Sequence, residues 1–294
     1  MMTFKTLLHR EWMQHQTGWL VLAGLPLVIM LLALPFGGVH MDGGESATDV
    51  VLVISGGYTL LVTLMAWMAV SFQATSLARR DQQDRSIEFW RSLPVSDWQA
   101  VGATSLMHLL LVPLVVMLVA AVSAVLVALL VVMRLYGAAA LVDLPWLSLI
   151  AAAAATVPRM VLGVLLAAFW AAPMLMLLML ASTWLKRWAV PVVLAVVGGG
   201  GAILKYAYQQ AWVHDTLGDL AERFLWAMIP LGRDGHRLDV EQGPASALAQ
   251  LPSWMLEDGL RVLGDVVTPL GLFAAVFAAA CFALQVQRRR QFGA

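Results

Sequence analysis

Six long apolar runs limit what this chain can fold into. Each is close to or above the roughly 20 residues that a helix needs to cross the hydrocarbon core of a bilayer. They cover residues 18–36, 50–77, 99–133, 158–184, 188–205 and 266–286. Hydrophobic residues make up 61% of the 294-residue chain and charged residues only 12%. We therefore predict an all-α integral membrane protein, a single domain over residues 1–294 with six transmembrane helices.

The charged residues predict which side of the membrane each loop faces. With both termini in the cytoplasm, 11 of the 18 basic residues but only 5 of the 18 acidic residues fall on the inner side. The short loop at residues 37–49 contains acidic residues and no Lys or Arg, as expected for an outer loop. We therefore predict that both termini are cytoplasmic. A net charge of zero gives no indication of a nucleic-acid partner.

Two segments outside the predicted spans are expected to lie at the membrane surface. In residues 1–17, Phe4, Leu7, Leu8 and Trp12 recur at helical spacing among charged residues, which predicts an N-terminal interfacial helix. Residues 134–157 are interpreted as an interfacial hairpin or helix on the outer side. Two additional spans are the alternative there.

Residues 206–265 are predicted to form an extracytoplasmic segment that contains short helices between spans 5 and 6. Apolar residues recur at intervals of three or four over 213–228, which predicts an amphipathic helix that ends before Pro230. Ser253 is the predicted N-cap of a second helix, whose apolar residues are Leu256, Leu260 and Leu263.

A polar segment at residues 78–98 separates spans 2 and 3. It contains four arginines and four carboxylates, and the spacing of Asp81 and Arg85 allows an ion pair on a helix. Pro94 should end that helix, because it disfavours helical backbone at the residue before it. The segment also carries large apolar residues, which favours a helix lying on a membrane surface or on a partner protein. A charged loop is the simpler alternative.

The run from Asp84 to Asp97, DRSIEFWRSLPVSD, resembles the cytoplasmic segment after the second span of ABC-2-type permeases, the membrane subunits of type V ABC transporters. In that family the segment forms a coupling helix that rests on the ATPase subunit. The chain departs from many members at residues 101–104, where a lysine is common. The resemblance implies ATPase contacts by Arg80, Asp84, Arg85, Ile87, Glu88, Phe89, Trp90, Arg91, Leu93 and Pro94.

The resemblance also implies a function. The chain would be the permease subunit of an exporter in a bacterial cytoplasmic (inner) membrane, paired with a second permease copy in a homodimer or a related heterodimer. ATP and Mg²⁺ would be bound by a separate cytoplasmic ABC ATPase subunit. The alternatives are a membrane anchor or assembly subunit without transport activity and, less favoured, an intramembrane enzyme.

No motif in the chain indicates its own catalysis or cofactor. Residues 198–201 are four glycines, but they lack the Gly-Lys-Ser/Thr ending of a phosphate-binding loop, so ATP hydrolysis is expected in a partner. Asp234, His236 and Asp239 are interpreted as solvated charges, His108 as a histidine buried near the inner interface, and no metal site is predicted. Cys281, the single cysteine, excludes an intramolecular disulfide.

A polar stripe in span 2 is the candidate transport pathway. Ser55, Thr59 and Thr63 follow one another at intervals of four, so they share one helix face. They either line a pathway or form hydrogen bonds across helices or to their own backbone. Gly198 and Gly199, interpreted as a flexible or closely packed point in span 5, complete the candidate pathway residues.

Overall fold

The computed structural model describes residues 4–36, 46–78, 96–230 and 244–291. These residues form helices and turns, with no strand among them. The helices in chain order are α1 (Phe4–Ala33), α2 (Ala47–Leu77), α5 (Asp97–Leu106), the π-helical turn η1 (Met107–Leu111), α6 (Val112–Tyr136), α7 (Ala139–Val142), α8 (Trp146–Leu185), η2 (Lys186–Trp188), α9 (Ala189–Val193), the π-helical η3 (Leu194–Gly199), α10 (Gly200–Tyr208), α11 (Trp212–Met228), α12 (Pro244–Gly264) and α13 (Pro269–Gln291).

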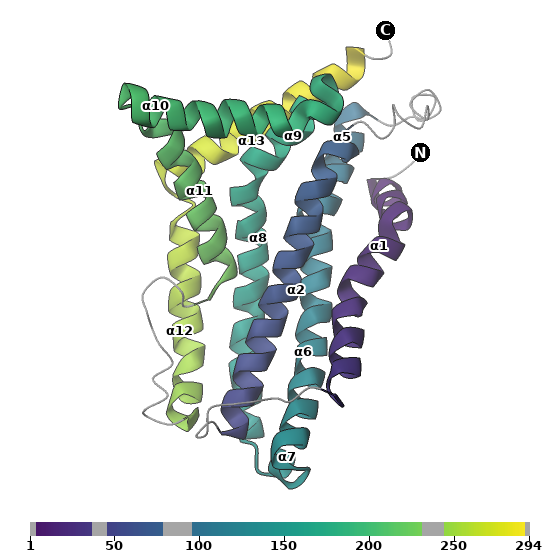
Figure 1. The fold of residues 1–294 in the computed structure, drawn as a ribbon, viewed down its shortest axis with the longest axis vertical. Helices are drawn as coiled ribbons and strands as arrows, with labels where there is room; N and C mark the ends of the chain where they lie inside the picture. The colour runs from purple at the N-terminus through teal and green to yellow at the C-terminus, as the bar shows by residue number, and fades with distance from the viewer. Residues whose placement is uncertain (1–3, 37–45, 79–95, 231–243, 292–294) are drawn as a thin grey trace.

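The centre of the molecule is a bundle in which α2, α6 and α8 run side by side (Figure 1). Helix α1 packs against α6 on one side, and α11 and α12 pack against α8 on the other. Helices α2 and α6 pack closely against each other, and small and β-branched residues are fully buried on both: Ala66 and Val70 of α2, and Ala120 and Ala124 of α6. Small side chains allow helix backbones to approach closely, which is how membrane helices gain packing energy.

Five helical segments are long and apolar enough to cross a membrane, which supports a multi-pass all-α membrane protein. They are Phe4–Ala33, Ala47–Leu77, Asp97–Tyr136, Trp146–Tyr208 and Pro269–Gln291. The predicted number of six spans is not confirmed. The difference lies in α9 and α10, which were expected to form span 5.

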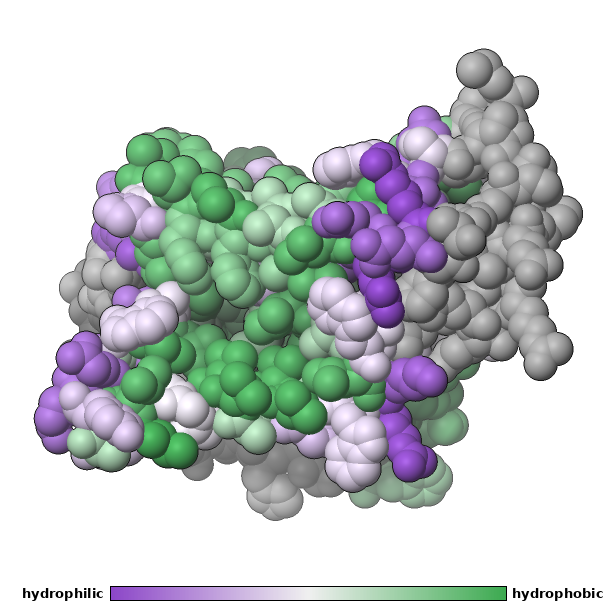
Figure 2. All heavy atoms as spheres, turned by 90° about the horizontal axis from the view of Figure 1, so that it is seen from above, coloured by the Kyte–Doolittle hydropathy of each residue, from purple (hydrophilic) through white to green (hydrophobic). Residues whose placement is uncertain are grey.

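Helices α9 and α10 continue from α8 but lie across the end of the bundle instead of along it (Figure 1). Two non-glycine residues with positive φ mark the turns on either side of this stretch: Lys186 at 53° and Gln209 at 57°. Seen from above, the middle of this end of the molecule is largely apolar, with hydrophilic residues toward its edges (Figure 2). Leu194, Val196 and Ile203 are about 60% exposed, so this helix offers an uncovered apolar surface to lipid or protein.

The predicted interfacial helix at residues 1–17 is not a separate element. Helix α1 continues through Gly18 to Ala33, and its first half packs against α5 and η1. Leu7, Glu11 and Trp19 are almost fully buried on its inward face. The apolar pattern predicted the helix correctly, but the buried carboxylate turns that face toward protein because Glu11 finds polar partners on α5 and η1.

Residues 134–157 form the connection between α6 and α8, with the short helix α7 inside it, and not two additional spans; their interfacial position stays a prediction. Helix α6 ends at Tyr136, beside Gly137 at φ 86°, and α8 begins at Trp146. Helix α8 then continues for 40 residues through Pro158, which was expected to begin span 4. Alanines 151–155 have the strongest helix propensity of any residue, and membrane helices tolerate an internal proline.

The described residues of the segment 206–265 include α11 and α12, of which α11 was predicted with nearly correct bounds. Helix α11 ends before Pro230 as expected, but α12 begins at Pro244, so Ser253 lies inside the helix and is not its N-cap. The Ser253 hydroxyl instead donates to the Gln250 carbonyl. Both helices pack along α8, and α11 begins beside α10, near the end that carries the termini (Figure 1).

Candidate functional site

The expected coupling helix lies mostly outside the described residues. This applies to Arg80, Asp84, Arg85, Ile87, Glu88, Phe89, Trp90, Arg91, Leu93 and Pro94, so their predicted ATPase contacts stay predictions. Asp234, His236 and Asp239 also lie outside the described residues. What the structure does describe is where the polar segment leaves α2 and where it enters α5, both at the end that carries the two chain termini (Figure 1).

The entry to α5 is firmly anchored. Ser96 and Gln99 form a capping box, in which each side chain accepts a hydrogen bond from the other residue's backbone N–H. Asp97 Oδ1 accepts a hydrogen bond from Arg289 Nε of α13 at 3.0 Å, and the Trp98 ring lies 5.2 Å from the Phe282 ring. A force applied to the segment at this point would therefore reach α5 and α13 together.

The polar stripe of span 2 is present on α2, and its hydroxyls bond to their own helix. Thr59 Oγ1 donates to the Ser55 carbonyl and Thr63 Oγ1 to the Thr59 carbonyl, both at 2.7 Å. Thr59 and Thr63 are buried inside the bundle. Gly198 and Gly199 are exposed on η3 at the bundle end, so the structure does not bring them together with the stripe.

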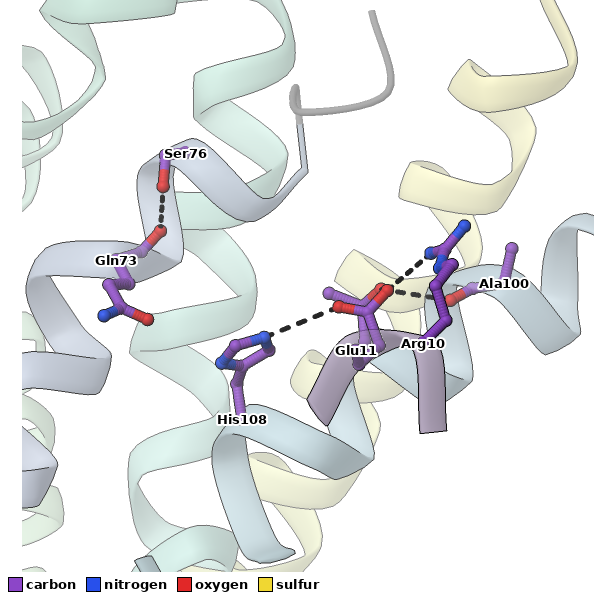
Figure 3. A network of polar contacts seen from close by, with 7 residues as sticks. Arg10, Glu11, Gln73, Ser76, Ala100 and His108 are labelled. Atoms are coloured by element: carbon purple, nitrogen blue, oxygen red, sulfur yellow. Dashed lines mark hydrogen bonds and ion pairs between the residues drawn. The ribbon is translucent and has the colours of Figure 1, made fainter. Parts of the chain in front are cut away.

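A buried polar cluster, not foreseen as a unit, joins α1 to α5 and η1. Glu11 is fully buried; its Oε1 accepts a hydrogen bond from Thr104 Oγ1 at 3.1 Å and is ion-paired with Arg10. Its Oε2 lies 3.5 Å from Nε2 of His108, whose side chain is 0% exposed (Figure 3). The His15 ring meets the His108 ring edge to face, with centroids 5.0 Å apart. His108 is therefore buried as predicted, but in contact with a carboxylate and a second histidine.

A second buried cluster holds α11 and α12 against α8. Arg159 of α8 donates through Nε to Asp258 Oδ2 of α12 at 2.6 Å. Its other two nitrogens donate to the carbonyls of Ala227 and Trp226, at 3.0 and 3.2 Å. These carbonyls belong to the last turn of α11, where a cation is favoured by the helix dipole. One side chain thus ties three helices together.

A glycine makes this contact possible. A Cβ added to Gly163 would lie 2.4 Å from the Ala227 carbonyl oxygen, a distance that side chains do not tolerate. Gly163 therefore lets the end of α11 come close enough for Arg159, one turn earlier on α8, to reach its carbonyls. One turn earlier on α11, Arg223 is ion-paired with Asp265 at 2.7 Å and lies over the Trp170 ring.

Neither Glu11 nor Arg159 was predicted from the sequence to be buried. For Arg159 a signal existed: it is a lone cation in an apolar stretch of predicted membrane helix, where an ionisable residue normally pairs with a partner. For Glu11 the neighbouring Arg10 and Lys5 suggested a solvated helix face.

The fold and these buried clusters define a multi-pass helical membrane protein with an internally paired bundle. Comparisons add no family assignment: the chain matches no protein-family model, no curated protein and no solved structure.

Proposed function

We propose that this chain is the permease subunit of an ABC transporter, driven by a separate cytoplasmic ATPase and exporting its substrate across a bacterial cytoplasmic membrane. The observation that carries the proposal is the run from Asp84 to Asp97, with its likeness to the coupling segment of ABC-2-type permeases. The apolar helical bundle is compatible with it. A second permease copy, identical or related, belongs to the proposal.

The position of the segment supports this function. It joins α2 to α5, so a partner that pushes it would act on two helices at once. One of them, α2, carries the Ser55–Thr63 stripe, and the other is bonded to α13 through Asp97 and to α1 through Thr104. ATP-driven movement of the segment would thus be transmitted to much of the bundle.

The proposal places both termini and the polar segment in the cytoplasm. Single-cysteine variants of a Cys281→Ser parent test this placement, because Cys281 is the chain's one native thiol. A cysteine at Asp42 should react with a membrane-impermeant thiol reagent from outside intact cells, whereas one at Gln83 should react only after the cells are opened. Reaction of Gln83→Cys in intact cells would contradict the proposed orientation.

The experiment that tests the function is purification of the tagged chain from its native membrane. The proposal predicts a co-purified protein with a Gly-x-x-x-x-Gly-Lys-Ser/Thr loop that hydrolyses ATP, present in a fixed ratio to the permease. A membrane anchor or assembly subunit would be recovered without such an ATPase. Recovery of the intact chain without an ATPase, from cells in which the partner is expressed, would contradict the proposal.

A further inference from the structure

The cluster of Glu11, His15 and His108 has the composition of a metal site. One ligand atom from each residue can be chosen so that all three lie within 4.8 Å of one another. The two α1 residues are four apart and therefore share a helix face, the spacing by which helices present two ligands to one metal. The third comes from η1, on a helix that packs against α1.

The local backbone explains why His108 points into this contact. It lies in a π-helical turn, and such turns occur frequently at functional sites because they redirect side chains. Pro113 follows this turn and lacks the N–H that an α-helix would donate to the Leu109 carbonyl. The wider turn at residues 107–111 places the imidazole between α1 and the bundle.

The hydrogen bonding of the buried His108 ring is the main indication that this cluster binds a ligand. Its side chain is completely buried, yet neither Nδ1 nor Nε2 has a hydrogen-bond partner among the described residues. Buried polar groups in proteins are almost always hydrogen-bonded, because an unsatisfied one is costly. Figure 3 shows the ring directed at Glu11, but the 3.5 Å separation from Oε2 is too long for a good hydrogen bond.

We propose that Glu11, His15 and His108 bind one divalent transition-metal ion, with Zn²⁺ as the best fit. Two imidazoles and one carboxylate are a set of three protein ligands that zinc accepts, whereas Ca²⁺ and Mg²⁺ prefer oxygen ligands. Ligands about 2.0–2.1 Å from a tetrahedral zinc lie roughly 3.4 Å apart, close to the 3.5 Å between Glu11 and His108. A water or an anion would take the fourth position.

The surroundings of Glu11 suit this role. Thr104 and Arg10 both hold Oε1, which orients the carboxylate so that Oε2 is directed toward His108. Groups that hydrogen-bond to a ligand in this way fix its direction and tune metal affinity. The ion would link α1 to η1, the turn that follows α5 in the chain. This proposal does not depend on the transporter function, because it concerns binding by the chain alone.

The test uses the full chain, purified in detergent with an affinity tag that contains no histidine and then stripped with a chelator. Titration with Co²⁺ should produce visible ligand-field absorption that saturates at one ion per chain, and Zn²⁺ should abolish it. Glu11→Gln and His15→Gln should each weaken Co²⁺ binding at least tenfold. His9→Gln, an exposed histidine on the same helix, is the matched control and should bind like the parent.

Thermal unfolding separates loss of metal binding from loss of fold. His15 is only partly buried, so His15→Gln is the decisive variant, whereas replacing the fully buried His108 would also disturb packing. Zn²⁺ should raise the Tm of the parent and of His9→Gln by several degrees and leave that of His15→Gln unchanged. Absence of stoichiometric Co²⁺ binding by the folded parent, or equal binding by His15→Gln, would overturn the proposal.

Discussion

The two buried clusters of this protein differ in how completely their polar groups are paired. All three guanidinium nitrogens of Arg159 have acceptors, one on Asp258 and two on the last turn of α11. In the Glu11 cluster, by contrast, neither ring nitrogen of His108 has a hydrogen-bond partner in the part of the chain that the structure describes. A fully satisfied network holds helices in one arrangement, whereas an incompletely satisfied one has capacity left for a ligand. The difference assigns a structural role to Arg159 and a binding role to His108.

The largest expected effect is the loss of the Arg159 side chain. Arg159→Met leaves Asp258 buried without its partner and should cost about 3–5 kcal/mol of stability. Unfolding of the detergent-solubilised protein measures this loss. Arg187→Met replaces an exposed arginine of η2, directly after α8, and should change stability by less than about 0.5 kcal/mol.

A double variant sharpens the same point. Arg159→Met with Asp258→Leu removes both charges, and it should recover much of the stability lost in Arg159→Met alone, since an apolar pair can replace a buried ion pair. If the double variant were less stable than either single variant, the Arg159–Asp258 ion pair would not be what holds α12 against α8.

In the Glu11 cluster, the expected effect of one lost hydrogen bond is smaller. Thr104→Val keeps the side-chain shape but removes the donor to Glu11, which should cost about 1.5–3 kcal/mol because the acceptor is a buried carboxylate. Thr216→Val is the control, since that hydroxyl donates at an exposed position to the Trp212 carbonyl of its own helix. Equal stability of the two variants in thermal unfolding would show that Glu11 does not need Thr104.

Gly163→Ala tests the close approach of α11 to α8. The new Cβ would meet the Ala227 carbonyl, and forced separation of the helices should cost about 1–3 kcal/mol. Gly57→Ala in α2 has open space around its Cβ and should be neutral or stabilising by up to about 1 kcal/mol. A neutral Gly163→Ala would mean that α11 does not rest on α8 as closely as described.

The smallest stability effect is expected in the span 2 stripe. Thr63→Val removes a hydroxyl that donates only to its own helix, so stability should change by less than roughly 0.5 kcal/mol. Transport measured in membrane vesicles distinguishes the two hypotheses for the stripe. A changed transport rate at unchanged stability would favour a pathway, and unchanged transport would assign the stripe to helix packing.

The sequence predicted the parts of this fold that depend on local pattern. Long apolar runs gave the membrane helices, and the three-to-four spacing over 213–228 gave α11 almost to the residue. Local signals were wrong where tertiary packing decided the outcome. Pro158 did not start a helix, Ser253 did not cap one, and the stretch expected as span 5 lies across the bundle end.

The buried clusters could not be assembled from local pattern because their partners are distant in sequence. Glu11 and Thr104 are 93 residues apart, and Arg159 and Asp258 are 99 apart. A single charged residue in an apolar run indicates that a partner exists, but it does not identify that partner. The proposed coupling segment differs again, since its proposed function requires a second protein and is inferred from a motif alone.

The most direct test of the central claim compares two neighbouring residues in that motif. Burial of a large aromatic side chain at an interface is worth roughly 1.5–3 kcal/mol, whereas an exposed ion pair contributes about 0–1 kcal/mol. Trp90→Ala should therefore reduce the amount of ATPase retained by the purified permease much more than Arg91→Ala does, with the folded permease recovered in equal yield. Equal retention of the ATPase by both variants and the parent would contradict the assignment of residues 78–98 as the coupling segment.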